Sequence, residues 1–294
     1  MRPAHVPSYV PAFELNGPVT NHCVARVLKS DLPEYPPGQL VVGRLPLAEY
    51  AVLDKEGVKM IGRKVENPHG LKDLGLFVGQ LGMPGLTAWS SLYEIGKPKK
   101  GETIFISSAA GAVGQVVGQI AKREGLKVIG SVGSDDKLEF ILKELGFDGG
   151  FNYKKEKPRD ALKRLAPEGI DIYYENVGGE QLEAALDAMN NWGRIVACGM
   201  ISQYNVPEQD RYGVKNIFLV VSKRITMRGF IVGDPDFGPK YEKEHQEKMS
   251  QWLAEGSVKA KLSVTDGIDN AAEGLVGMLE GRNFGKAVVK IKDE

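Results

Sequence analysis

Cysteine is scarce in this sequence, because Cys23 and Cys198 are the only two among its 294 residues. Two thiols cannot build a disulfide framework, nor a structural zinc site made of four cysteines. The four histidines are scattered along the chain without the spacing of metal ligands. We therefore predict no disulfide scaffold and no catalytic metal.

An excess of charge of either sign is also missing, since Lys plus Arg and Asp plus Glu both number 38. This balance argues against a general affinity for nucleic acid or for a membrane surface. No apolar run approaches the roughly 18–20 residues that a membrane-spanning helix needs. Residues 1–7 lack the apolar core of a signal peptide. We expect a cytoplasmic globular protein.

Glycine, in contrast, is abundant, with 36 residues, and one glycine-containing turn carries the main functional signal. A β-prone run over residues 104–106 leads into Ser-Ser-Ala-Ala-Gly-Ala-Val-Gly at 107–114, and a helix-forming segment follows over 115–124. Gly111 would let the backbone approach a pyrophosphate, and Gly114 would let the helix pack closely on the strand. Ala112 and Val113 complete the turn, whose helix N-terminus suits a negative charge. The turn predicts a dinucleotide site, although Ala109 replaces the usual first glycine.

The end of the next predicted strand indicates which dinucleotide binds. NAD-binding chains place an acidic residue there for the ribose 2′-hydroxyl, whereas this sequence has Ser131. Gly133 and Lys137 follow it, and a lysine at this place favours a 2′-phosphate over a solvated helix surface. We therefore predict NADP(H) as the cofactor.

The chain is expected to fall into two parts with different rhythms. Residues 1–82 hold short β-prone runs at 24–28, 38–43 and 48–53 with prolines between them, which predicts a β-rich domain. From residue 101 strands and helices alternate, which predicts a doubly wound parallel sheet of the α/β class. We predict strands at 103–108, 127–131, 150–153, 170–175 and 193–198, and helices at 112–124, 135–146, 158–166 and 179–190.

The remaining elements complete the predicted domain boundaries. A strand over 224–232 and a helix over 239–255 close the sheet-bearing part, and a helix over 271–280 follows. A last strand over 286–291 is expected to return to the N-terminal module. The dinucleotide-binding domain would thus cover residues 83–258, and the β-rich domain residues 1–82 plus 259–294.

Four further side chains fall at predicted strand ends, where open α/β sheets bind ligands. Tyr153 could contact a ligand or pack in the core, and Asn176 could bind a ligand or cap the helix that follows it. Cys198 lies in an apolar strand, which favours a buried inert thiol over a nucleophile. Tyr204 could hydrogen-bond a carbonyl or enolate, or it could be an ordinary surface tyrosine.

Seven motifs in order resemble one family, the zinc-independent medium-chain reductases that include prostaglandin reductase and the alkenal double-bond reductases. The motifs are AAGAVG at 109–114, GSDDK at 133–137, FNYK at 151–154, ENVGG at 175–179, CGMISQYN at 198–205, GFIV at 229–232 and NFGK at 283–286. The resemblance spans the chain from about residue 8 onward. It implies a Rossmann domain with a smaller GroES-like domain, and a homodimer.

The resemblance further implies reduction of the carbon–carbon double bond of an α,β-unsaturated aldehyde or ketone by NADPH. Gly111 to Gly114 would meet the pyrophosphate, and Lys137 with Tyr153 the 2′-phosphate region. Asn176, Cys198, Phe230, Ile231, Val232 and Asn283 would line the cofactor cleft. Tyr204 matches the tyrosine that this family places beside the nicotinamide, and it is the predicted catalytic residue.

One departure from the family pattern concerns the N-terminal domain. Family members have further strands ahead of an Asp-Pro-Tyr-Met-Arg-like segment, whereas this sequence opens at Met1-Arg2. We expect a shortened β-rich domain without an aromatic wall of the substrate cleft, and with sheet edges that are exposed or covered by a partner subunit. Two alternatives to the reductase stay open: a quinone oxidoreductase of the same superfamily, and an NADPH-binding protein with weak or no activity.

Overall fold

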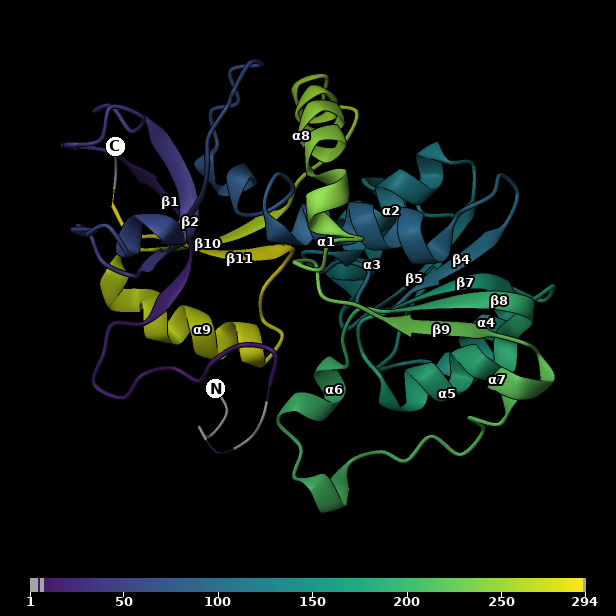
Figure 1. The fold of residues 1–294 in the computed structure, drawn as a ribbon. Helices are drawn as coiled ribbons and strands as arrows, with labels where there is room; N and C mark the ends of the chain where they lie inside the picture. The colour runs from purple at the N-terminus through teal and green to yellow at the C-terminus, as the bar shows by residue number, and fades with distance from the viewer. Residues whose placement is uncertain (1–4, 6–7, 293–294) are drawn as a thin grey trace.

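The main sheet of the computed structural model has six parallel strands in the order β6-β5-β4-β7-β8-β9 (Figure 1). The structure describes residues 5 and 8–292. The strand order reverses between β4 and β7, which makes this junction the topological switch point where such sheets bind ligands. The six strands are β4 (Thr103–Ile106), β5 (Lys127–Val132), β6 (Gly149–Asn152), β7 (Ile170–Glu175), β8 (Met189–Ala197) and β9 (Thr226–Gly229). The predicted doubly wound parallel sheet is confirmed.

Helices cover both faces of this sheet and bury two separate apolar cores. One core packs α1, α2, α3 and α8 against the sheet, and the other packs α4, α5 and α7 against the opposite face. The strands are apolar because both of their faces are buried. The helices are α1 (Met83–Ser91), α2 (Gly114–Arg123), α3 (Asp135–Lys143), α4 (Pro158–Leu165), α5 (Gly179–Ala188), α7 (Leu219–Ser222) and α8 (Gly238–Ala254).

Two smaller sheets lie to the other side of α1 and α8 (Figure 1). An antiparallel sheet joins β1 (Thr20–Arg26), β2 (Leu40–Pro46) and β3 (Ile61–Lys64), and a parallel pair joins β10 (Leu262–Asp266) to β11 (Lys286–Lys290). Helix α9 (Ala271–Leu279) connects the strands of that pair. Within the described residues β1 and β3 each pair with β2 only, so they are the two edge strands of the antiparallel sheet.

Several predicted elements are wrong. Residues 48–53 form no strand, and Val52 is fully exposed, so this apolar run has no sheet to join. The strand predicted over 224–232 ends at Gly229, and the helix predicted to reach residue 190 ends at Ala188 because β8 begins at Met189. The last strand pairs with β10, which the sequence analysis missed, and Lys292 just after it donates to the Tyr50 hydroxyl of the N-terminal module over 2.6 Å, as the predicted return of this strand requires.

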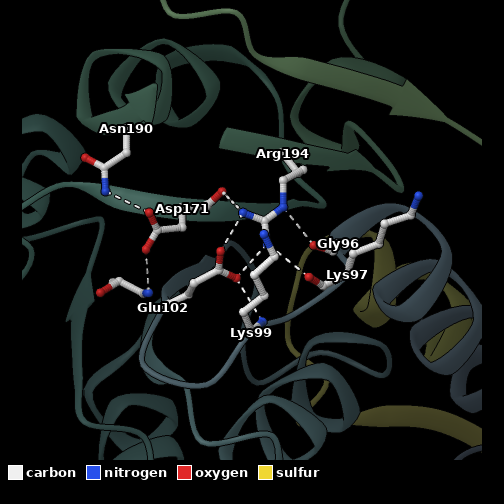
Figure 2. Close-up of polar contacts among 8 residues, drawn as sticks. Gly96, Lys97, Lys99, Glu102, Asp171, Asn190 and Arg194 are labelled. Carbon is white, nitrogen blue, oxygen red and sulfur yellow. Dashed lines mark hydrogen bonds and ion pairs between the residues drawn. The ribbon is translucent and has the colours of Figure 1, made fainter. Parts of the chain in front are cut away.

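The amino-terminal edge of the main sheet is held by a polar cluster around Arg194, shown in Figure 2. The guanidinium group donates to both carboxylate oxygens of Glu102, at 2.9 and 2.6 Å. It also donates to the carbonyls of Gly96 and Lys97, which end a π-helical turn after α1. The cluster therefore joins β8 to the loop that enters β4, at the edge opposite to the carboxyl ends of the strands.

Two negative findings apply to the described part of the chain. None of its helices is both long enough and apolar enough to span a bilayer. None of its regions brings three His, Cys, Asp or Glu side chains together as metal ligands would be. Cys23 and Cys198 are both free thiols.

Candidate functional site

The glycine turn lies between β4 and α2, at the switch point of the sheet. Ser108 adopts a left-handed backbone (φ 52°), which reverses the chain directly after the strand. A Cβ on Gly114 would lie 2.4 Å from the Ser108 carbonyl oxygen and 2.8 Å from the Ala109 Cα. The start of α2 can therefore approach this turn only with glycine at position 114. Within the first turn of α2, the Gln115 N–H donates to the Gly111 carbonyl over 3.1 Å, and the Val116 and Val117 N–H groups donate to the Val113 carbonyl, so the helix starts directly from the glycine turn.

A second group of predicted residues meets at the ends of β5 and β6. Tyr153 follows β6, and its hydroxyl lies 3.0 Å from the place where a Cβ on Gly133 would stand. Its ring is 44% exposed, so the core-packing alternative for Tyr153 is wrong. The Lys137 ammonium, on α3, donates to the Gly281 carbonyl over 2.9 Å. Burial lowers the pKa of Lys137, and the positive charge of nearby Lys154 lowers it further, as expected where cations lie together without an anion.

Ser131 does not have the place that the sequence analysis gave it. The strand β5 continues to Val132, so Gly133 is the residue that follows it. Ser131 is fully buried, and its hydroxyl donates to the Gln181 side chain of α5 over 2.5 Å. The absence of an acidic side chain at this strand end stands, but Ser131 itself faces the protein interior.

Asn176 follows β7, directly across the switch point from the glycine turn. Its side-chain amide donates to the Ser107 carbonyl over 2.8 Å, and its backbone N–H donates to the Ser107 hydroxyl over 2.9 Å. The residue at the N-cap of α5 is Gly178, with no side-chain cap, so the capping alternative for Asn176 is wrong. Asn176 therefore joins the end of β7 to the end of β4.

The loop after β8 holds Cys198 and Tyr204. Burial raises the pKa of the Cys198 thiol to about 11, which agrees with an inert thiol and not with a nucleophile. Met200 precedes the short helix α6 (Ile201–Tyr204), and its N–H donates to the hydroxyl oxygen of Tyr204 at the end of that helix over 3.0 Å. A Cβ on Gly199 would lie 3.0 Å from the same hydroxyl. The phenol is thus held above the end of β8 although its ring is 61% exposed.

The last predicted residues lie at two other borders of this edge. Phe230, Ile231 and Val232 follow β9, with Phe230 stacked on Phe237 at 4.8 Å between ring centroids. Asn283 donates to the Gly285 carbonyl over 2.9 Å. Gly285 forms an isolated β-bridge with Gly111, which brings the segment before β11 onto the glycine turn.

One buried group at this edge was missed. Glu175, the last residue of β7, has a fully buried side chain and lies next to Asn176. The available signal was a charged residue directly after the apolar run Ile172–Tyr174, because isolated carboxylates are rarely buried without a purpose.

Comparison with known proteins identifies the family of this chain. A family described as the N-terminal domain of oxidoreductases matches residues 1–61, and one described as zinc-binding dehydrogenases matches residues 112–255. An NADP-dependent oxidoreductase RED1 of Cochliobolus heterostrophus is 57% identical over 100% of this chain and 83% of its own length. The chain belongs to the alkenal/prostaglandin reductase family of the medium-chain dehydrogenase/reductase superfamily.

Two further relatives agree with this assignment. A 2-alkenal reductase (NADP(+)-dependent) of Nicotiana tabacum is 43% identical over 98% of this chain and 81% of the relative. The crystal structure of CurA from Vibrio vulnificus in complex with NADPH superposes with a TM-score of 0.87 at 35% identity, and covers 98% of this chain and 84% of CurA. The protein is an NADP-dependent oxidoreductase, and the prediction of NADP(H) as its cofactor is confirmed.

Proposed function

We propose that this enzyme reduces the carbon–carbon double bond of α,β-unsaturated aldehydes and ketones, with Tyr204 as its catalytic residue. The observation that carries the proposal is the position of the Tyr204 hydroxyl, which the Met200 N–H holds at the carboxyl edge of the sheet, above the end of β8. Similarity to a 2-alkenal reductase and to a (+)-pulegone reductase of Mentha piperita, 41% identical, supports the substrate class.

The residues at the strand ends fit the two charged parts of NADPH. Gly111, Ala112, Val113 and Gly114 form a turn whose backbone a phosphate can approach, and the missing Cβ of Gly114 lets α2 begin close to Ser108. Lys137, with Lys154 nearby and Tyr153 against Gly133, offers a cationic and aromatic corner for the 2′-phosphate and the adenosine. Asn176, Cys198, Phe230 to Val232 and Asn283 would border the remaining cofactor between these ends. When bound, NADPH supplies the hydride that the β-carbon of the substrate accepts.

Tyr204 would act on the oxygen of the substrate. Its hydroxyl oxygen already accepts the Met200 N–H, so its own proton is directed away from the loop and can be donated to a carbonyl. A donor in this place stabilises the negative charge that develops on the oxygen as the β-carbon is reduced. The same hydroxyl is a candidate source of the proton that the α-carbon finally takes.

The test is NADPH oxidation with a panel of 2-alkenals, enones and quinones, repeated with Tyr204→Phe. We expect turnover of enones, and a loss in kcat of about 10- to 1000-fold in the variant. Tyr212→Phe is the matched control, since Tyr212 lies in the adjoining segment and is 41% exposed. Binding of NADPH without turnover of any acceptor would refute the proposal, and turnover of quinones alone would favour a quinone oxidoreductase.

The remaining features of the proposal concern organisation. Balanced charge and two free thiols support a cytosolic location. Strand β9 pairs only with β8 among the described residues and so leaves one edge of the main sheet open to a second subunit, which supports a homodimer. We also propose a β-rich domain (1–82 plus 259–294) and a cofactor domain (83–258), which is supported by the main sheet lying wholly within 83–258.

A further inference from the structure

Glu175 is a fully buried carboxyl group at the switch point, and the proposed reaction does not use it. Its Oε1 accepts the N–H groups of Val177 and Gly178 at 2.6 and 2.8 Å, and the Tyr173 hydroxyl at 2.8 Å. Its Oε2 is buried and has no hydrogen-bond partner among the described residues. Burial raises the pKa of this carboxyl group, so the fold spends free energy to keep a polar side chain here.

The first connection of Glu175 leads to the glycine turn. The Ser107 hydroxyl lies 3.2 Å from Oε1 of Glu175 and also accepts the N–H of Asn176. The Ser107 carbonyl in turn accepts the Asn176 side-chain amide. Because Ser107 is the residue between β4 and the turn, the carboxyl group sets the spacing between that turn and the end of β7.

The second connection leads to Tyr204. The Glu175 carbonyl accepts the N–H groups of Cys198 and Gly199, both over 3.0 Å. One residue further along, the Asn176 carbonyl accepts the Ile201 N–H over 3.1 Å. The segment that carries Tyr204 is thus attached to the same short turn that the Glu175 side chain holds from within.

We propose that Glu175 is a positioning residue, whose carboxyl group fixes the turn 176–178 and thereby the placement of the Tyr204 loop relative to the cofactor turn. This inference rests on the proposed function. Without an acceptor at Oε1, the Val177 and Gly178 N–H groups lose their partner in a buried setting, and the turn must shift to satisfy them. A shift of this kind changes the geometry of the reacting groups more than it changes the core.

The experiment compares Glu175→Ala and Glu175→Gln with Asp171→Ala as a matched control. Asp171 also joins β7 to β4, through the Thr103 N–H over 2.9 Å, but at the amino-terminal edge. We expect Glu175→Ala to lower kcat about 10- to 100-fold and to weaken NADPH binding, whereas Asp171→Ala lowers only the melting temperature. Glutamine keeps the acceptor oxygen, so Glu175→Gln should recover kcat to within about fivefold of the native enzyme.

The outcomes separate this inference from the proposed function. If Glu175→Ala and Asp171→Ala lose equal melting temperature and keep equal kcat and NADPH affinity, Glu175 is only structural and the inference fails. Failure of a folded Glu175→Gln variant to recover kcat would also overturn it. If the native enzyme reduces no enone, the proposed function fails, and the NADPH affinity of Glu175→Ala alone then tests the role of Glu175. This test remains because the cofactor turn is one of the two loops that Glu175 holds. Should Glu175→Ala not fold, Ser107→Ala takes its place, with a smaller loss in the same direction.

Discussion

Replacing Arg194 by alanine should destabilise the enzyme without changing its chemistry. The Arg194 and Glu102 side chains are only 16% and 17% exposed, and they form a bidentate pair (Figure 2). Removing one partner of a buried pair costs about 3–5 kcal/mol, because the other charge stays behind without compensation. Because the pair is partly exposed, we expect a smaller loss of about 2–4 kcal/mol in the free energy of unfolding. This figure includes the cost of leaving the Gly96 and Lys97 carbonyls without their donor.

The assay is urea or thermal unfolding followed by circular dichroism. A loss of this size lowers the melting temperature by about 4–12 °C in a chain somewhat longer than 250 residues. Arg164→Ala is the matched control: Arg164 also donates to both carboxylate oxygens of Glu156, from Nε and Nη2, but the two side chains are 55% and 33% exposed. An exposed pair contributes about 0–1 kcal/mol. Equal losses in the two variants would refute the argument from burial, and a changed KM for NADPH in Arg194→Ala would refute its separation from the site.

Three further predictions concern the site and the core. Lys137→Ala should weaken NADPH binding about 10- to 100-fold and NADH binding little, because it removes the cation that we propose for the 2′-phosphate. Lys143→Ala, on the exposed side of α3, is the control in the same fluorescence titration. Gly114→Ala should weaken binding of both NADPH and NADH at least about tenfold, because the new Cβ would collide with the Ser108 carbonyl oxygen. An unchanged Kd for both dinucleotides would show that the turn adapts to the Cβ. Burial lowers the pKa of His245 to about 4, below the value of about 6.5 expected in the unfolded chain. The free energy of unfolding should therefore be highest above about pH 6.5 and should fall by about 3 kcal/mol as the pH falls toward 4. Urea unfolding at several pH values should show this dependence, and His245→Gln should flatten it.

The main sheet was predictable because its strands carry their own signal. Strands β4, β5 and β7 each hold a run of apolar residues and end in turns with glycine or polar residues, so the parallel sheet and its ligand edge follow from local pattern. The β10 segment, Leu-Ser-Val-Thr-Asp, is half polar and gains its pairing only from β11, which lies more than twenty residues away. Such a strand has no local signature.

Side-chain direction limited the prediction of the site. Ser131 was expected at the end of its strand, but the strand continues to Val132 and Ser131 is fully buried. Asn176 and Tyr204 were placed at the correct edge, yet their partners, Ser107 and the Met200 N–H, depend on how separate loops meet. Contacts between distant segments are set by tertiary packing and cannot be obtained from one segment's pattern.

The bridge between Gly111 and Gly285 has a consequence for how the protein is made. The six strands of the main sheet are complete once residue 229 has left the ribosome, and domains generally fold as units during synthesis. The glycine turn, however, gains its last neighbour only when the segment before β11 has been translated. A nascent chain with a finished sheet would therefore hold an unfinished cofactor site, and cellular NADPH could stabilise the enzyme only after nearly all of this sequence had emerged.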